Sequence, residues 1–512
     1  MGADGGVIIS SERTLGREEL MDRAARAASG LLGSGGRAGG AVAILLRNDF
    51  AFLETVFAAG SIGAQAVPVN WHFKAAEINF ILEDSGATHL IAHADLLREL
   101  DGRLPSGLEV LSVPTPPEVA AAYAIDAAEC GPVPGVAEWA AFLERHPPLP
   151  REEQRKGGTM MYTSGTTGRP KGVRRQALDP RRHRLDAELR QLWFGNRPGM
   201  STAIVGPMYH SVQLSYTTAA VQAPGRVLLV PRFDAEQLLA VIEAEHLTHL
   251  HLVPIMMSRL VKLPREVRER YDTSSLEFVV HGSAPCPPEV KGKLIDWLGP
   301  IVHEYYGTTE AGMVSRASSE EWRERPGTVG RAWPGREVRI CDDEGRLLAR
   351  GEPGEVYMSL GPMPDFTYQN ADAERAEIER DGLVTSGDIG YLDEDGYLYL
   401  CDRKRDLVIS GGVNIYPAEI EGVLAAHPAV LDSAVFAVPD DDYGERAMAA
   451  VQLREDADAD PEELRQFLRA RLAGFKVPRV IEIRDALPRE PSGKIAKRRL
   501  RDPYWAHAGR MI

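Results

Sequence analysis

The first hundred residues alternate between short apolar runs and longer segments with a helical repeat of apolar positions. Ala41–Leu46, AVAILL, is a continuous apolar run with the length of a buried strand. In Asn48–Gly60, residues Phe50, Leu53 and Phe57 fall on one helical face. The runs AQAVPV and THLIAH repeat the strand signal on either side of the helical FKAAEINFILEDSG. This alternation predicts parallel strands joined by crossover helices, and therefore an α/β layered domain.

Downstream the pattern changes several times. Leu104–Gly158 has little periodicity and much proline, which favours a surface insertion followed by a linker. After Gly330, alternating runs around turn residues predict antiparallel hairpins and a small β-barrel-like module. Near the end of the chain, Asp460 and Pro461 mark the start of a helix between strand-like runs, which is typical of a small α+β domain.

The length of 512 residues exceeds what one ordinary hydrophobic core supports, so at least two domains are expected. We predict an α/β fold with a large N-terminal domain over residues 1–401, built of layered α/β subdomains plus the β-rich module. A small mobile α+β domain is expected over residues 402–512. The segment CDRKRDLVISGG is charged and then glycine-rich, which suits a hinge near residues 402–406.

Composition narrows the class of protein. The net charge of −15 argues against a nucleic-acid partner, because phosphate backbones require clustered Lys and Arg. The four cysteines are far apart, which predicts neither a disulfide framework nor a zinc site. The sequence shows no secretory signal and no apolar run of the ~20 residues that a membrane-spanning helix needs. A cytoplasmic protein without an integral membrane segment is expected, and a homodimer stays open.

One loop has the composition of a phosphate-binding site. Thr163–Gly172, TSGTTGRPKG, follows the apolar run TMMY and combines four hydroxyls, three glycines and Lys171. Pro170 stands where the Walker A pattern needs glycine, and no G-x-G occurs, so neither the P-loop nor the dinucleotide pattern fits. Hydroxyls and inward-facing backbone N–H groups suit a polyphosphate held by many weak donors. An ordinary flexible turn is the competing interpretation.

TSGTTGRPKG resembles the phosphate loop of the adenylate-forming superfamily, which includes acyl-CoA synthetases, peptide-synthetase adenylation domains and luciferases. Four further segments resemble the motifs of this family in the same order, across nearly the whole chain. They are YYGTTE at Tyr305–Glu310, TSGDIG at Thr385–Gly390, DRKRDLVISGG at Asp402–Gly412 and PSGKIAKR at Pro491–Arg498.

The resemblance implies a two-step ligase reaction that uses ATP, Mg²⁺ and coenzyme A. A carboxylate attacks the α-phosphate of ATP to give an acyl adenylate and pyrophosphate, and a thiol then displaces AMP. Negative charge that grows on the phosphate needs a metal ion and fixed cations. A hard carboxylate such as Glu310 suits magnesium, and Asp388 can accept hydrogen bonds from ribose hydroxyls. A plain turn role remains open for both carboxylates.

The resemblance also assigns the individual residues. The implied catalytic residues are Thr163, Lys171, His210 and Lys494. The implied metal ligands are Glu310 and Thr167, and Arg405 occupies the hinge position, where relatives more often have Asp or Lys. The implied nucleotide and CoA contacts are Thr163, Ser164, Gly165, Thr166, Thr167, Gly168, Lys171, Gly282, Ser283, Ala284, Pro285, Glu304, Tyr305, Tyr306, Gly307, Thr308, Thr309, Asp388, Arg403, Gly411, Gly412 and Lys494.

The acid that would be activated is not readable from the sequence. The expected pocket residues are Tyr209, His210, Val253, Met257, His281, Gly307 and Met313. This mixed set allows a medium- or long-chain fatty acid, an aromatic acid or an alicyclic acid. His210 would flank the incoming carboxylate, with interior packing as the alternative. His246, His249 and His251 lack a further ligand for a metal, which favours ordinary strand packing.

Three functional classes remain in competition. The leading hypothesis is an acyl-CoA synthetase, and its rival among enzymes loads a carrier protein in trans. Only 18 residues follow Lys494, too few for a fused carrier domain. A non-catalytic nucleotide-binding relative would be expected to have lost Lys494 or Glu310, and both are present. The motifs leave luciferase-like oxidation open. The basic run VRRQALDPRRHRLD after Lys171 suits either the phosphates of CoA or a solvated helix start.

Overall fold

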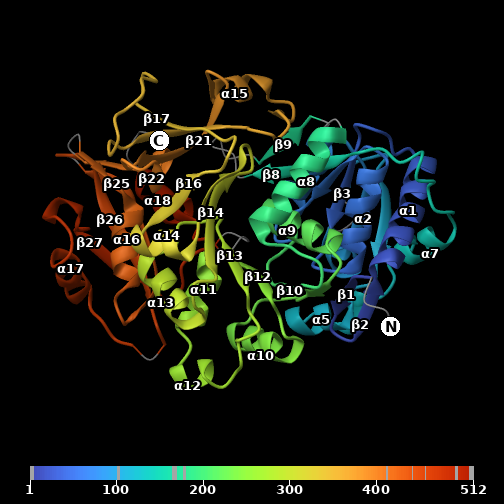
Figure 1. Ribbon diagram of the computed structural model, residues 1–512, viewed down its shortest axis with the longest axis horizontal. Coiled ribbons are helices and arrows are strands. Elements are labelled where there is room, and N and C mark those ends of the chain that lie inside the picture. The colour runs from blue at the N-terminus through green and yellow to red at the C-terminus, as the bar shows by residue number, and fades with distance from the viewer. Residues whose placement is uncertain are drawn as a thin grey trace.

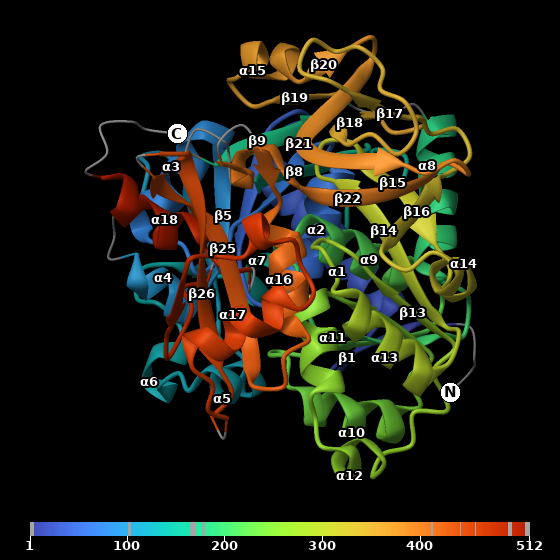
Figure 2. The ribbon, with the colours of Figure 1, turned by 90° about the vertical axis from the view of Figure 1, so that its left-hand side faces the viewer.

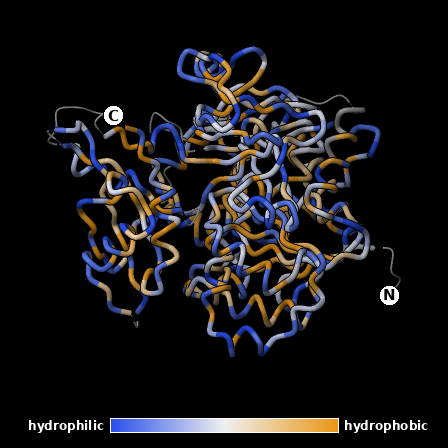
Figure 3. The backbone as a smooth tube through the Cα atoms, turned by 60° about the vertical axis from the view of Figure 1, so that its left-hand side comes forward, coloured by the Kyte–Doolittle hydropathy of each residue, from blue (hydrophilic) through white to orange (hydrophobic). Residues whose placement is uncertain are grey.

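The computed structural model describes residues 5–100, 104–163, 170–176, 180–410, 413–440, 442–455, 457–489 and 494–506. Figure 1 shows a large body that runs from the N-terminus through the yellow and orange strands, with a smaller body formed by the last, red part of the chain. Both bodies combine helices and strands, as expected from the alternating pattern. Figure 3 shows hydrophobic segments running through the interior while hydrophilic segments concentrate on the outer loops.

The N-terminal alternation builds a largely parallel sheet with strand order β19-β9-β8-β4-β3-β5-β6-β7 within the described ranges. Neighbouring strands β4, β3, β5 and β6 run parallel, and helices such as α1 and α2 pack together beside them. Its strands are β3 (Ala41–Leu45), β4 (Gln65–Pro68), β5 (Ala87–His93), β6 (Glu109–Val113), β7 (Ala137–Glu138), β8 (Gly158–Thr163), β9 (Lys171–Arg175) and β19 (Phe366–Tyr368).

The interpretation of Leu104–Gly158 as a surface insertion and linker is wrong. Strands β6 and β7 extend the parallel sheet, and Trp139 at the start of α7 donates its indole N–H to the buried Glu54 at 2.6 Å. The elements of this segment are four to seven residues long apart from the two-residue β7, which is too short to produce a clear period in the sequence.

A second sheet crosses the large body and has 14 strands among the described residues, in the order β17-β18-β21-β22-β16-β15-β14-β13-β12-β10-β11-β1-β2, with β20 beside β21. The strands β11, β10, β12, β13 and β14 are parallel, whereas the β-rich module after Gly330 continues the same sheet with antiparallel strands. The strands are β1 (Val7–Ser10), β2 (Arg13–Gly16), β10 (Ser201–Ile204), β11 (Arg226–Leu229), β12 (His249–Leu252), β13 (Phe278–His281), β14 (Val302–Thr308), β15 (Gly312–Ala317), β16 (Thr328–Ala332), β17 (Val338–Cys341), β18 (Gly354–Ser359), β20 (Glu379–Arg380), β21 (Leu383–Leu392) and β22 (Tyr397–Arg403).

The small body has its own sheet, in the order β24-β23-β26-β25 with β27 beside β26 in the part of the chain that the structure describes. Asp460 caps α17 by accepting the N–H groups of Glu462 and Glu463 at 2.8 Å, as the sequence predicts. Figure 2 shows this body, with β25, β26 and α16, in front of the large body. Its strands are β23 (Val408–Ser410), β24 (Val413–Ile415), β25 (Val430–Asp440), β26 (Gly444–Leu453) and β27 (Val480–Ile483).

The helices cover the faces of the sheets. They are α1 (Arg17–Gly33), α2 (Phe50–Ser61), α3 (Ala75–Ser85), α4 (Ala94–Glu99), α5 (Pro117–Tyr123), α6 (Ala127–Cys130), α7 (Trp139–Glu144), α8 (Pro180–Phe194), α9 (Ser211–Gln222), α10 (Ala235–Glu245), α11 (Pro254–Val261), α12 (Arg265–Arg268), α13 (Pro288–Leu298), α14 (Ser319–Glu324), α15 (Asp372–Glu377), α16 (Pro417–Ala425), α17 (Pro461–Arg469) and α18 (Lys497–Trp505). Within the described ranges, every helix is too short or too polar to cross a membrane. The four cysteines are free thiols.

A buried ion pair ties α13 to β14, the strand that carries the YYGTTE motif. Lys291 is fully buried, and its ammonium lies 2.7 Å from Glu304 Oε2. It also lies 5.0 Å from the centroid of the Trp322 ring. Removing one partner of such a pair leaves an uncompensated buried charge, so the pair fixes the position of β14.

We expect Lys291→Met to lower the free energy of unfolding by about 3–5 kcal/mol, because Glu304 loses its buried counter-ion. The double variant Lys291→Met/Glu304→Gln should recover much of this loss, as measured by urea denaturation. Lys293→Met on the same helix is the matched control, because Lys293 is exposed and should change stability by less than about 0.5 kcal/mol. Equal effects of the two lysine substitutions would contradict this account of the pair.

Candidate active site

Three of the predicted nucleotide residues meet at the junction of β14, β21 and β22. The hydroxyl of Tyr306 donates to Asp388 Oδ2 at 2.7 Å, and that of Ser386 donates to the same oxygen at 2.8 Å. Arg403 Nε lies 3.1 Å from Asp388 Oδ1 across the β21–β22 pair. Burial and the neighbouring carboxylate raise the pKa of Tyr306 well above its ordinary value, so Tyr306 remains a donor. The structure therefore builds one cluster around a buried carboxylate from three separate motifs.

Glycine is required where two segments cross beside this cluster. A Cβ on Gly282 would lie 2.5 Å from the ring of Tyr305, and one on Gly307 would lie 2.2 Å from the carbonyl oxygen of Gly312. The next residue, Ser283, has a positive φ of 71° and its hydroxyl lies 3.1 Å from that of Tyr305. The backbone of the GSAP segment therefore packs directly against the Tyr305 side chain of β14. The predicted adenine site requires such a close approach of the two segments.

The end of the YYGTTE motif is held by residues that the sequence analysis missed. Arg175 Nη2 donates to the carbonyl oxygens of Thr309 at 2.7 Å and Glu310 at 2.9 Å. The hydroxyl of Tyr368 donates to Glu310 Oε1 at 3.1 Å. In the sequence, Arg175 is one cation in a basic run and Tyr368 stands outside every motif, so no local pattern distinguishes them.

The phosphate loop begins and ends on paired strands. Thr163 of β8 and Lys171 of β9 are opposite residues in an antiparallel register. Lys171 forms an ion pair with Glu374 of α15 and lies 5.4 Å from the centroid of the Tyr368 ring. The loop residues Ser164, Gly165, Thr166, Thr167 and Gly168, the glycines Gly411 and Gly412, and Pro491–Gly493 lie outside the described residues.

His210 brings the two bodies into electrostatic contact. It stands at the N-cap position of α9 without a side-chain capping bond, and its Nε2 is buried without a hydrogen-bond partner in the described ranges. Burial, the ammonium of Lys494 and the imidazole of His72 lower the pKa of His210 to about 3. The ring of Tyr209 lies 4.4 Å from that of His210, centroid to centroid. The charge of Lys494 in the small body therefore acts on His210 in the large body, and His210 is neutral at pH 7.

A chain of hydrogen bonds crosses the sheet behind this site. The amide of Gln213 lies 3.0 Å from Nδ1 of His251, and Nε2 of His251 lies 3.0 Å from the hydroxyl of Tyr305. His249 lies 2.8 Å from the carbonyl oxygen of Gly195. The described residues hold no group of three or more His, Cys, Asp or Glu side chains that could bind a metal ion.

The sheet divides the predicted pocket residues between its two faces. Leu252, His281 and Glu304 are opposite one another in register, so their side chains share the face covered by α13. Glu304 binds Lys291 there, which leaves only its main chain on the side of the predicted nucleotide site. His281 is fully buried, 3.7 Å from Glu304 Oε2, and burial lowers its pKa far below the ordinary value.

The other predicted pocket residues are divided in the same way. Met257 and the partly buried Val253 belong to the apolar core on the α11 and α13 face. Met313, opposite Gly307 in the β14–β15 pair, belongs to the core on the α9 face. Only the residues near α9, such as Tyr209 and Met313, lie on the side that carries His210.

Comparison with known protein families supplies the identity. Residues 3–363 match the AMP-binding enzyme family, and residues 419–494 match the AMP-binding enzyme C-terminal domain. The chain belongs to the AMP-binding enzyme family. The resemblance to adenylate-forming enzymes that the five motifs indicated is therefore confirmed.

Individual AMP-binding enzymes are similar over nearly the whole chain. A feruloyl-CoA synthase from Amycolatopsis sp is 35% identical over 488 residues, covering 94% of this chain and 92% of that protein. The fatty acid–[acyl-carrier-protein] ligase ScoC of Streptomyces coeruleorubidus is 31% identical, and the match covers 99% of this chain and 94% of that protein. The structure of the o-succinylbenzoate CoA synthetase of Bacillus subtilis, solved with its acyl-adenylate intermediate, superposes with a TM-score of 0.80 at 26% identity. The match covers 97% of this chain and 95% of that chain. The predicted fold class is thereby confirmed.

The buried histidine of the hydrogen-bonded chain makes stability depend on pH. Burial lowers the pKa of His251 to about 3, whereas an unfolded histidine titrates near 6.5. The unfolded state therefore takes up a proton first, and this contribution to stability is lost as the pH falls from 6.5 towards 3. Between pH 7 and pH 5, wild type should lose about 2 kcal/mol more than His251→Gln, as measured by urea unfolding at both pH values. Parallel losses in the two proteins would contradict the prediction.

Proposed function

We propose that the chain is an ATP-dependent carboxylic acid–CoA ligase that forms an acyl adenylate and then a thioester with CoA. The observation that carries the proposal is the Tyr306–Asp388–Arg403 cluster, in which the residues predicted for the nucleotide contact one another. In addition, Lys494 of the small body is close enough to His210 to help lower its pKa. Residues 1–401 would bind ATP and the acid, and residues 402–512 would turn about a hinge near 402–406 between the two steps. The family match and the relatives support this reaction class.

Asp388 and Arg403 bind the ribose in this proposal, and Tyr306 lies against the adenine. The Asp388 carboxylate has about four acceptor positions, of which Tyr306, Ser386 and Arg403 use three. One ribose hydroxyl can therefore donate to Asp388 without displacing a protein group. Binding of the second hydroxyl requires Arg403 or Tyr306 to give up its bond.

Magnesium is the metal that this donor set fits. Glu310 offers a hard carboxylate oxygen, and Arg175 and Tyr368 hold its main chain and side chain in place. Together with Thr167, Glu310 would hold an ion that neutralises the charge of the ATP phosphates. Lys171 adds a fixed ammonium at the end of the phosphate loop, and Glu374 keeps its side chain oriented when no phosphate is bound.

Lys494 and His210 act on the incoming carboxylate in different ways. His210 is neutral, so it orients the acid through its ring and its unpartnered Nε2 rather than by charge. Lys494 supplies the positive charge where the carboxylate oxygen approaches the α-phosphate. The acyl chain then extends on the α9 side of the sheet, beside Tyr209 and Met313.

A carrier-loading ligase is the second candidate, because ScoC covers nearly the whole chain. We expect pyrophosphate release with an aromatic, alicyclic or medium- to long-chain fatty acid, followed by a CoA thioester detectable by mass spectrometry. The measurement is pyrophosphate release across a panel of acids, with CoA, with a carrier protein and with neither acceptor. Turnover that a carrier protein accelerates and CoA does not would replace the ligase proposal by carrier loading.

We expect Lys494→Ala to reduce adenylate formation by ~10²–10³-fold, because one positioned cation is lost from the transition state. Thioester formation from supplied acyl adenylate and CoA should stay within about twofold of wild type. The two half-reactions are measured separately, by pyrophosphate release and by thioester yield. Lys293→Ala, on the exposed surface of α13, is the control. Wild-type pyrophosphate release by Lys494→Ala would show that the assignment of Lys494 is wrong.

A further inference from the structure

Lys497 lies three residues after Lys494, and its side chain is about four-fifths buried beside the proposed hinge. We propose that Lys497 is a positioning residue, whose ammonium is held by Glu421 and faces the carboxylates of the hinge, and which thereby places Lys494 for adenylate formation. This inference rests on the proposed function, because it assigns Lys497 a role that acts through Lys494.

Glu421 joins three elements of the small body at one carboxylate. Lys497 Nζ at the start of α18 lies 2.7 Å from Glu421 Oε1, and each side chain is only 21% exposed. The same Glu421 oxygen accepts the backbone N–H of Val435 in β25 at 2.6 Å. Glu421 itself belongs to α16. The first residue of α18 is therefore fixed against both α16 and β25.

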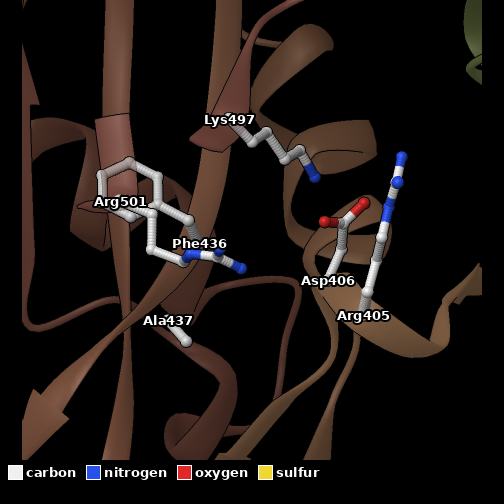
Figure 4. A pocket seen from close by; sticks show the side chains of 6 residues that line it. All are labelled: Arg405, Asp406, Phe436, Ala437, Lys497 and Arg501. Atoms are coloured by element: carbon white, nitrogen blue, oxygen red, sulfur yellow. The ribbon is translucent and has the colours of Figure 1, made fainter. Parts of the chain in front are cut away.

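The hinge supplies two further carboxylates. In Figure 4, Lys497 and Asp406 approach each other from opposite walls of a cavity of about 10 Å³, which has room for no more than about one water molecule. Burial disfavours the charge on Lys497, but Glu421, Asp402 and Asp406 outweigh it and raise the pKa of Lys497. A permanent ammonium therefore stands beside the hinge residue Arg405.

One of these carboxylates lies on the large-body side of the hinge. Asp402 belongs to β22 of the 14-stranded sheet, and its Oδ2 accepts the N–H of Ala418 in the first turn of α16 at 2.8 Å. Rotation about residue 405 would carry α16 and Lys497 away from Asp402. The Ala418–Asp402 hydrogen bond and the attraction between Lys497 and Asp402 therefore favour the domain orientation of this structure, in which the charge of Lys494 acts on His210.

The backbone transmits the position of Lys497 to Lys494. Three extended residues span at most about 11 Å, so anchoring Lys497 confines the Cα of Lys494 to that radius. Between them, the N–H of Ala496 donates to the carbonyl oxygen of Pro488 at 2.8 Å, and Ile495 forms a bridge with Arg489. Arg489 in turn binds Asp432 of β25 at 2.6 Å. Lys494 thus lies between Arg489, which binds β25 through Asp432, and Lys497, which is linked to β25 through Glu421.

The test compares Lys497→Ala, Lys497→Arg and Lys494→Ala in the full-length protein, with the acid that the panel identifies. We expect Lys497→Ala to lower adenylate formation by ~10–100-fold, since a displacement of about 1 Å at the reacting groups can cost ~10²-fold. Thioester formation from supplied acyl adenylate should stay within about twofold of wild type, and Lys497→Arg should restore most of the adenylation rate. Arg498→Ala is the matched control, because Arg498 is the next residue along the chain and its side chain is exposed and pairs with Asp502.

Two further measurements separate positioning from a general structural role. In the double variant Lys494→Ala/Lys497→Ala, adenylation should be no slower than in Lys494→Ala alone, because Lys497 acts through Lys494. The inference would be overturned if Lys497→Ala slowed both half-reactions equally and also lowered the thermal midpoint of unfolding. It would also be overturned if Lys497→Ala formed the adenylate at the wild-type rate. If Lys494→Ala loses adenylation and Lys497→Ala does not, only the inference fails. If Lys494→Ala keeps it, the proposed role of Lys494 fails as well.

Discussion

A carboxylate and a polyphosphate have to come into contact in this site, and the repulsion between these two anions is the constraint on which the architecture depends. The chain as a whole carries a net charge of −15, so the compensating cations must be concentrated locally. In the proposed reaction these cations are Lys171 from β9 of the N-terminal sheet, Arg403 from β22 of the 14-stranded sheet and Lys494 from the small body. The proposed reaction therefore requires the two bodies to be aligned.

Carboxylates hold these cations in place before the substrates arrive. Arg403 faces Asp388, Lys171 faces Glu374, and Lys497 next to the hinge faces Glu421. Such pairs keep flexible cationic side chains oriented before substrates bind. The buried Lys291–Glu304 pair does the same for the strand beneath them, because it fixes β14 and therefore the YYGTTE motif.

The predicted site residues that the structure brings together are those whose contacts are set by direct strand pairing or by a close backbone approach. Gly282 and Gly307 are needed because a Cβ would clash with the neighbouring chain, and Asp388 and Arg403 meet because their strands pair directly. Arg175 and Tyr368 escaped prediction, because they act through contacts between residues more than 50 positions apart. His281 and Met257 were expected in the pocket. Strand register instead puts His281 on the face covered by α11 and α13, and Met257 packs from α11 into the core on that face. Long-range packing and strand register decide such positions, and no motif encodes them.

The central claim is that a carboxylate oxygen of the acid attacks the α-phosphate of ATP. This oxygen then bridges carbon and phosphorus in the acyl adenylate, and it stays on AMP when the thiol displaces AMP. The most direct measurement is isotope transfer with an acid labelled with ¹⁸O in both carboxylate positions, incubated with ATP, magnesium and CoA. Acyl adenylate formation predicts that each AMP released carries one ¹⁸O and that the pyrophosphate carries none. Label in phosphate or pyrophosphate, or ADP as the nucleotide product, would contradict the account.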